Sequence, residues 1–156
     1  MTVHKHKVLA YITHDGRLLV FRHPDHPDAG IQVPGGTVAA GEDPAVAVLR
    51  EAMEETGLRS LRLASHLGDF EQSVPERGEN WTRHYYHLVC EEDPPETWRH
   101  DELFPADGTP GPITFEFFWV NLPDGVPKLA AGHEVMVGMI DGRDGEQESR
   151  QIAPES

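Results

Sequence analysis

Apolar and polar positions alternate or cluster in two short runs near the start of the chain. The first run covers residues 7–12 and the second residues 17–21, and the His-Asp-Gly sequence at residues 14–16 between them is typical of a tight turn. This pattern predicts two strands joined as a hairpin. A shorter apolar run at residues 31–33 leads into Pro34 and two glycines, and it predicts a third strand that ends in a loop.

The clearest helix signal covers residues 44–56. Asp43 suits the N-cap, Pro44 suits the first helical position, and Gly57 suits the left-handed conformation that ends many helices. With about 100° of rotation per residue, this helix has one broad apolar arc, which we expect to face the core. The arc consists of Ala45, Val46, Val48, Leu49, Ala52 and Met53.

Three further segments are rich in β-branched and aromatic residues. They predict strands at residues 61–70, 82–90 and 113–122. Between the last two, residues 91–112 are acidic and rich in proline, which predicts a long loop.

The C-terminal part of the chain is less regular. Residues 129–140 predict a last helix, although Gly132 and Gly138 weaken its helical tendency. Residues 141–156 contain few apolar side chains and predict a disordered acidic tail. We therefore expect one domain over residues 1–140, of the α/β or α+β class.

The charge of the chain limits its partners. There are 27 acidic and 13 basic side chains, which gives a net charge of −14. Such a chain repels phosphate at long range, so we expect no nucleic-acid partner, and a phosphate-bearing substrate would need a bound cation.

Cysteine use and hydropathy indicate the compartment. The chain has one cysteine, Cys90, which excludes a disulfide within the chain. The first residues lack a signal-peptide apolar region, and no run approaches the roughly 18 apolar residues of a membrane span. We therefore expect a cytoplasmic protein with no membrane partner.

Three glutamates of the predicted helix carry the first chemical signal. Glu51, Glu54 and Glu55 stand at positions i, i+3 and i+4, so they are expected to share the face opposite the apolar arc, with Arg50 at its edge. Like charges at this spacing destabilise a helix by a few tenths of a kcal/mol per pair, which a divalent cation would offset. Carboxylate oxygens suit Mg²⁺ or Mn²⁺. A merely solvated acidic face has the same pattern, so the cluster alone does not decide.

The surrounding residues extend this pattern. The segment GGTVAAGEDPAVAVLREAMEETGL, residues 35–58, resembles the Nudix box, G-x5-E-x7-R-E-U-x-E-E-x-G-U, in which U is aliphatic. Ala52 is the one departure, because it stands where the box has a bulkier aliphatic residue, and it still packs as an apolar group. The residues that match in register are Gly36, Glu42, Arg50, Glu51, Glu54, Glu55, Gly57 and Leu58.

The resemblance implies a fold and a reaction. The fold is an α/β/α sandwich with a mixed central sheet, in which the box forms a loop, a helix and a second loop. The reaction is hydrolysis of a diphosphate linkage in a nucleoside diphosphate joined to another group X, by attack of water on phosphorus. Mg²⁺ or Mn²⁺ would offset charge on the phosphate oxygens.

The resemblance also implies roles for residues. Glu51, Glu54 and Glu55 are the expected metal ligands, together with the Gly35 carbonyl, and Arg50 would hold the glutamates in place through Glu42. Glu54 is the expected general base, with Glu51 as the alternative. Gly36 and Gly57 would shape the loops on either side of the helix. An additional acidic ligand outside the box is expected from among Glu96, Glu102 and Glu116.

Substrate contacts are expected outside the box. Arg22 ends the second predicted strand, near the start of the box loop, while Trp81, Arg83 and Tyr85 combine aromatic faces with positive charge. An exposed strand end and an ordinary alternation of core and surface residues explain these positions equally well.

Histidines are numerous but do not predict a metal site. The chain has ten, among them the pairs His4 and His6, and His23 and His26. Zinc sites need three or four converging ligands, and the sequence spaces no third partner beside either pair.

Two other functions stay open. A Nudix-fold sensor would bind a nucleotide without cleaving it, although such domains usually lose box glutamates that this chain keeps. An RNA-processing Nudix enzyme is the second, and the net charge argues against it. The resemblance also suggests a homodimer, while the identity of the small nucleotide substrate depends on residues outside the box.

Overall fold

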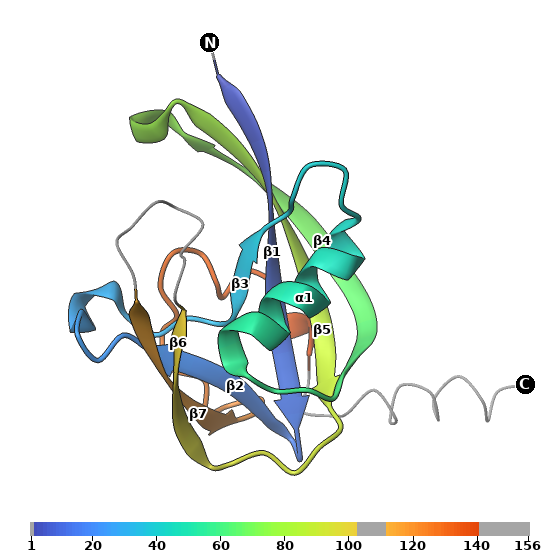
Figure 1. The fold of residues 1–156 in the computed structure, drawn as a ribbon, viewed down its shortest axis with the longest axis vertical. Coiled ribbons are helices and arrows are strands. Elements are labelled where there is room, and N and C mark those ends of the chain that lie inside the picture. Colours follow the sequence, from blue (N-terminus) through green and yellow to red (C-terminus); the bar gives the residue numbers. More distant parts are fainter. Residues whose placement is uncertain (1, 103–111, 141–156) are drawn as a thin grey trace, which may run out of the picture.

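Seven strands of the described residues form one mixed sheet, and helix α1 lies across one of its faces (Figure 1). The computed structural model describes residues 2–102 and 112–140. The elements are β1 Val3–His14, β2 Arg17–Arg22, β3 Gly35–Thr37, α1 Pro44–Thr56, β4 Leu61–Val74, β5 Glu79–Cys90, β6 Thr97–Glu102 and β7 Ile113–Asn121, with short 3₁₀ helices η1 Pro27–Ala29, η2 Pro75–Arg77 and η3 Val137–Met139.

Strands β1 and β2, at the centre of the sheet, pair only near the turn that joins them and then separate. Its order is β4-β5-β1-β2-β7-β6, with β1 and β5 parallel and the other pairs antiparallel. β1 pairs with β2 only at Thr13 and His14, next to the turn. Further along, β3 takes the place of β2 and pairs with β1 at Lys7, Val8 and Leu9. The divergence of β1 and β2 leaves space for a cleft.

Strand β1 separates two hydrophobic cores. Val8, Ala10 and Ile12 pack towards α1, while Leu9 and Tyr11 pack on the opposite face. This alternation is the period of two that a strand imposes on its side chains. The second face is covered by the chain after β7, which supplies the apolar side chains Leu122, Val126, Leu129, Met136, Val137 and Ile140.

Helix α1 has the predicted ends. The Asp43 side chain accepts a hydrogen bond of 2.8 Å from the backbone N–H of Ala45, and Gly57 adopts a φ of +79°. The predicted apolar arc is wrong at two positions, because Val46 is 58% exposed and Met53 is exposed as well. The helix is turned so that Ala47 and Glu55 are buried with Val48 and Ala52. Because Glu55 lies on the inner face of the helix, Val46 and Met53 are exposed to solvent.

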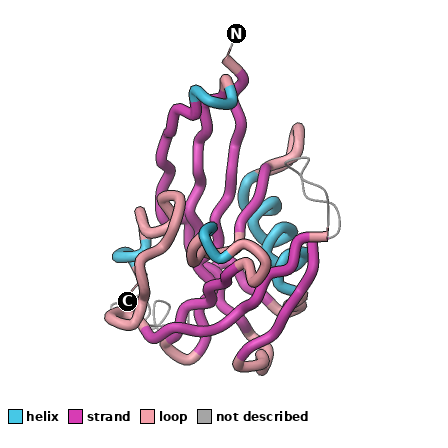
Figure 2. The backbone as a smooth tube through the Cα atoms, turned by 90° about the vertical axis from the view of Figure 1, so that its left-hand side faces the viewer, coloured by secondary structure: helices cyan, strands magenta, loops and turns pink. Residues whose placement is uncertain are grey.

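Several predicted boundaries are wrong. The third strand is Gly35–Thr37, and Ile31 and Gln32 form only isolated bridges. The predicted loop at residues 91–112 contains β6, whose charged sequence TWRHDE obscures its alternation. Strands β4 and β5 extend beyond their predicted ends and meet at η2. Figure 2 shows them running with the start of β1 past the rest of the sheet.

The predicted last helix at residues 129–140 is also wrong. This segment forms turns and the short helix η3, and Ala131 and Gly132 have φ values of +57° and +80°, which interrupt a helix. The predicted tail at residues 141–156 lies outside the described residues. The α+β class with a mixed central sheet is confirmed. Among the described residues, no helix is long and apolar enough to cross a membrane.

Strand β6 holds the C-terminal end of α1. The Trp98 indole N–H donates to the Thr56 carbonyl at 2.8 Å, and His100 Nε2 lies 3.0 Å from the Glu54 carbonyl oxygen. The Trp98 ring also stacks on Phe117 of β7. These contacts satisfy carbonyls that have no partner within the helix, and they fix the turn that carries two box glutamates.

His133 anchors the segment that covers the second face. Its Nδ1 accepts a hydrogen bond of 3.0 Å from the backbone N–H of Val33, so the buried ring is held neutral. Burial, with a smaller contribution from the positive charge of Arg83, lowers the pKa of His133 to about 3. The unfolded chain binds this proton below its ordinary pKa of 6.5, whereas the folded chain does not.

We therefore expect His133 to contribute to acid sensitivity. Its stabilisation is complete above pH ~6.5 and is lost as the pH falls towards 3, at up to about 1.4 kcal/mol per pH unit. Urea unfolding at several pH values measures this slope. His133→Asn keeps an acceptor for the Val33 N–H and should have a shallower slope, while His26→Asn, an exposed control, should match the unchanged protein. Equal slopes for all three proteins would contradict the assignment.

Candidate active site

A cleft of about 300 Å³ lies where β1 and β2 diverge, and its lining carries charges of both signs. The carboxylates Glu51, Glu55 and Glu102 form what we call its acidic wall. Lys7 and Arg83 form its cationic wall. A mainly apolar stretch, including Phe21, Val33, Ile113 and Phe115, completes the lining.

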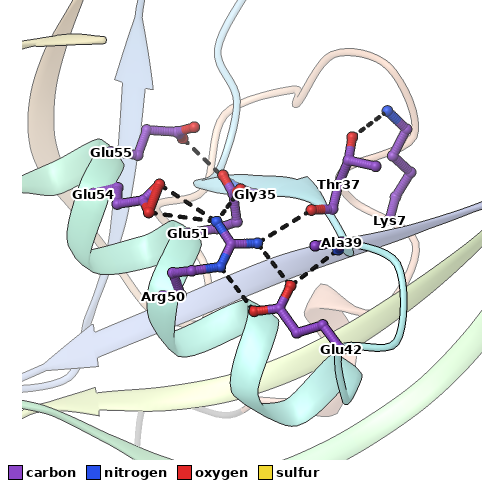
Figure 3. A network of polar contacts seen from close by, with 9 residues as sticks. All are labelled: Lys7, Gly35, Thr37, Ala39, Glu42, Arg50, Glu51, Glu54 and Glu55. Carbon is purple, nitrogen blue, oxygen red and sulfur yellow. Dashed lines mark hydrogen bonds and ion pairs between the residues drawn. The ribbon is translucent and has the colours of Figure 1, made fainter. Parts of the chain in front are cut away.

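Arg50 organises the acidic wall (Figure 3). Its Nε and Nη2 donate to the two carboxylate oxygens of Glu42, both at 2.8 Å. Its Nη1 donates to Glu51 at 2.8 Å and lies 3.4 Å from both oxygens of Glu54. The hydrogen bonds to Glu42 contribute most to raising the pKa of Arg50, and those to Glu51 contribute less. The same bonds from Arg50 lower the pKa of Glu42 to about 2. The guanidinium thus joins the box loop to the helix.

Glu51 and Glu55 are the inward-facing carboxylates. Burial raises the pKa of Glu51 despite its ion pair with Arg50. Burial, with repulsion from Glu102, raises the pKa of Glu55 well above its usual value. The Glu55 carboxylate accepts one hydrogen bond of 3.3 Å from the Gly35 N–H. Carboxylates gathered in this way suit a divalent cation with oxygen ligands.

Gly35 and Gly36, at the start of the box, allow this close approach. A side chain at Gly36 would place its Cβ 2.1 Å from a carboxylate oxygen of Glu51, and one at Gly35 would place it 2.5 Å from the Val8 carbonyl oxygen. No side chain fits at either position without displacing its neighbour.

The three box glutamates do not share one face as expected. Glu51 and Glu55 line the cleft, whereas the Glu54 side chain is 60% exposed, against 13% for Glu51. The cause is the rotation of α1 that also exposes Val46. Glu54 therefore lies on the solvent side of the Arg50 network.

Of the three additional acidic candidates, only Glu102 lines the cleft. Glu96 pairs with Arg17 at 2.9 Å, and Glu116 pairs with Arg22 at 2.7 Å. Glu102 stands at the end of β6, the strand that sequence reasoning treated as loop.

Of the four predicted substrate residues, two line the cleft and two do not. Trp81 and Arg83 line the cleft, while Tyr85 is fully buried and donates its hydroxyl to the Gly132 carbonyl at 3.0 Å. Arg22 does not line the cleft and is engaged with Glu116.

Sequence reasoning missed Lys7. Its Nζ donates to Thr37 Oγ1 at 2.8 Å and lies 4.6 Å from the centre of the Trp81 ring. Burial, with repulsion from neighbouring cations, lowers its pKa. Arg83 lies over the same ring at 5.6 Å and donates to the Ala131 carbonyl. The signal was available, because Lys7 is a charged residue at the head of an otherwise apolar run.

The sequence model of the NUDIX domain matches residues 3–141. The chain belongs to the NUDIX family. The box residues of this family form the loop and helix described above, in which Gly36 lies against the Glu51 carboxylate and α1 packs on the sheet. NUDIX hydrolases generally use divalent metal ions, in agreement with the cluster of buried carboxylates.

Solved structures show the same fold. The MutT NUDIX hydrolase from Burkholderia pseudomallei superposes with a TM-score of 0.61 at 25% identity, over 88% of this chain and 98% of that one. The E. coli ORF135 protein superposes with a TM-score of 0.61 at 17% identity, over 99% of this chain and 96% of that one.

A curated relative matches a shorter segment. The RNA pyrophosphohydrolase of Gluconobacter oxydans (strain 621H) is 38% identical over 68 residues, which are 43% of this chain and 40% of that protein. The match thus spans less than half the length of this relative.

Gly36→Ala should displace Glu51 and weaken metal binding, because the new methyl group overlaps the carboxylate. We expect Mn²⁺ affinity, measured by calorimetry, to fall by about tenfold or more, the scale of losses seen when a ligand's support is disturbed. Gly138→Ala is the matched control, since no atom lies within 4 Å of its added Cβ. Unchanged affinity in a folded Gly36→Ala protein would contradict a role of Gly36 in placing Glu51 for metal binding.

Proposed function

We propose that this chain hydrolyses a diphosphate linkage in a nucleoside diphosphate joined to another group X, with Mg²⁺ or Mn²⁺ as cofactor. The observation that carries the proposal is that one cleft is lined both by the carboxylates Glu51, Glu55 and Glu102 and by the cations Lys7 and Arg83. A diphosphate between these walls would meet metal-held charge on one side and protein cations on the other.

The proposed metal ligands are Glu51, Glu54, Glu55 and the Gly35 carbonyl, with Glu102 as the additional ligand. Glu51 and Glu55 have raised pKa values because they are buried, so they gain most from a cation. The ion would polarise the phosphate and orient the attacking water. Glu54 would complete the set from the solvent side.

We assign the general base to Glu54, with Glu51 as the alternative. Glu54 is exposed, so water reaches its carboxylate, and Arg50 lies within 3.4 Å to orient it. Its role is to accept the proton that the attacking water loses. Arg50 itself acts as a positioning residue, since its closest partners, at 2.8 Å, are Glu42 and Glu51.

Lys7 and Arg83 are the proposed phosphate contacts. Arg83 is fixed by its hydrogen bond to Ala131, and Lys7 by its bond to Thr37, so both cations are held in place before substrate arrives. Trp81 packs against both. The apolar side chains Phe21, Ile113 and Phe115 would accept the base or the group X.

Hydrolysis of pyrophosphate from the 5′ end of RNA is the second candidate. The match to the Gluconobacter RNA pyrophosphohydrolase favours it. The net charge of −14 opposes it, because such a surface repels a long polyanion. In either case we propose a cytoplasmic enzyme that acts as a homodimer.

Glu54→Gln should lower kcat by about 10²- to 10⁴-fold, the usual contribution of a general base. A panel of nucleoside triphosphates, dinucleoside polyphosphates, nucleotide sugars, dinucleotide cofactors and 5′-triphosphorylated RNA, each with Mg²⁺ and with Mn²⁺, identifies the substrate by chromatography of products. Glu76→Gln, an exposed glutamate on η2, is the control and should keep full activity.

Near-normal activity of Glu54→Gln, with loss in Glu51→Gln, would move the base to Glu51. If no member of the panel is cleaved while one of them raises Tm, the chain is a sensor and the proposed function is wrong.

Lys7→Met should raise KM with little change in Tm. A hydrogen bond to a charged group is worth about 1.5–3 kcal/mol, which corresponds to a KM increase of about tenfold or more. Lys5→Met is the matched control, because Lys5 lies on the same strand and pairs with Glu79 at 2.8 Å outside the cleft. Equal KM values for the two variants would exclude a phosphate contact by Lys7.

A further inference from the structure

A cluster of histidines and one aspartate lies outside the cleft, where β4, β5 and β1 run side by side. His66 Nε2 and His84 Nδ1 lie 2.7 Å and 2.8 Å from the same oxygen of Asp69. His6 Nδ1 lies 3.0 Å from the other ring nitrogen of His84. None of these four residues lines the cleft.

A β-bulge brings His66 and Asp69 to one face. Residues three apart on a regular strand point to opposite faces of a sheet. The register shifts between His66 and Gly68, so that His66 stands opposite Tyr86 and Asp69 opposite His84. Tyr86 and His84 are two apart on β5 and share a face, and so do the residues opposite them. The bulge therefore re-aims the two side chains, a common effect of an extra residue in a strand.

The donor atoms match the needs of a transition metal. The nearest donor atoms of His66, Asp69 and His84 all lie within 4.8 Å of one another. Tetrahedral Zn²⁺ with bonds of about 2.0–2.1 Å holds its ligand atoms about 3.3 Å apart, so small side-chain rotations are enough to admit the ion. The His66 side chain is 46% exposed, which leaves an open path from solvent and a position for water.

His6 is placed to set the tautomer of His84. When His84 Nδ1 binds a metal, its Nε2 carries the proton and donates to His6 Nδ1. The two rings are within 14° of parallel with 5.2 Å between their centres, as an in-plane hydrogen bond between them requires, and this contact fixes the plane of the ligand. Metal-binding histidines generally have such a partner for their second nitrogen.

We propose that His66, Asp69 and His84 bind one transition-metal ion, Zn²⁺ in preference to Mg²⁺, with His6 as a positioning residue. Two imidazoles and one carboxylate suit Zn²⁺, whereas the all-oxygen donor set of the cleft suits Mg²⁺ or Mn²⁺. The ion would join β4 to β5 across the bulge. This site does not depend on the function proposed for the cleft.

The sequence hides this site. His66, Asp69 and His84 are separated by 3 and 15 residues, and His6 lies 78 residues before His84. The pairing of β5 with both β4 and β1 brings them together. His6 thus has a partner in His84 that its spacing in the sequence does not indicate.

Calorimetry with Zn²⁺ on the full metal-stripped chain, in an excess of Mg²⁺ that competes for the carboxylates of the cleft, tests the proposal. We expect one Zn²⁺ per chain, a rise in Tm, and intense visible absorption when Co²⁺ replaces Zn²⁺. His66→Ala and Asp69→Asn should each weaken binding by about 100-fold or more. His6→Ala should weaken it by about 10- to 100-fold, the scale of losses when the hydrogen-bond partner of a metal ligand is removed. His26→Ala is the control and should bind Zn²⁺ normally.

Either of two results would overturn the site. One is no saturable Zn²⁺ binding by the unchanged chain. The other is Zn²⁺ binding that persists in folded His66→Ala and Asp69→Asn proteins and is lost in Glu51→Gln, which would place the ion in the cleft. Circular dichroism of each variant establishes that it is folded.

Discussion

The ion pair between Arg50 and Glu42 is the contact on which the acidic wall depends. One guanidinium satisfies both oxygens of Glu42 and one oxygen of Glu51, and it reaches Glu54 at a longer distance. Glu42 also accepts the Ala39 N–H, so the loop before α1 closes on the same carboxylate. A lysine could not replace this geometry, because its single ammonium lacks the planar fork that binds two acceptors at once. Three carboxylates can thus stand close together without the loop and helix separating.

The cleft also depends on the divergence of β1 and β2. A continuous pairing of these strands would fill the space that the cleft occupies. β3 satisfies the exposed edge of β1 for only three residues, and its glycines bring the backbone close to α1 without side chains in between. The sheet therefore supplies a hollow with rigid edges, and residues from both of its faces reach into it.

Local signals in the sequence predicted the box helix to the residue, because Asp43, Pro44 and Gly57 act within one turn of its ends. They did not predict which side of the helix faces inward. Hydrophobic periodicity assumes that apolar residues are buried, and here Glu55 takes an inner position that Val46 loses. Strand β6 was missed for a similar reason, since its sequence TWRHDE is mostly polar and only Trp98 packs against the apolar core. Lys7 stands out as a charge in an apolar run, but the long-range pairing that places it opposite Arg83 and near Trp81 has no local signal.

The hydrogen bonds from Trp98 and His100 to the carbonyls of α1 have a mechanical consequence. They link β6, which carries Glu102, to the helix turn that carries Glu55, so that the position of one carboxylate depends on that of the other. The cationic wall belongs to β1 and β5, which are joined by eleven consecutive paired positions. The cleft therefore lies between two groups of charged residues with different hydrogen-bonded supports, and we propose that the first group binds metal and the second binds substrate. Under that proposal, replacement of side chains on β1 and β5 would alter what is bound and would leave the proposed metal ligands in place.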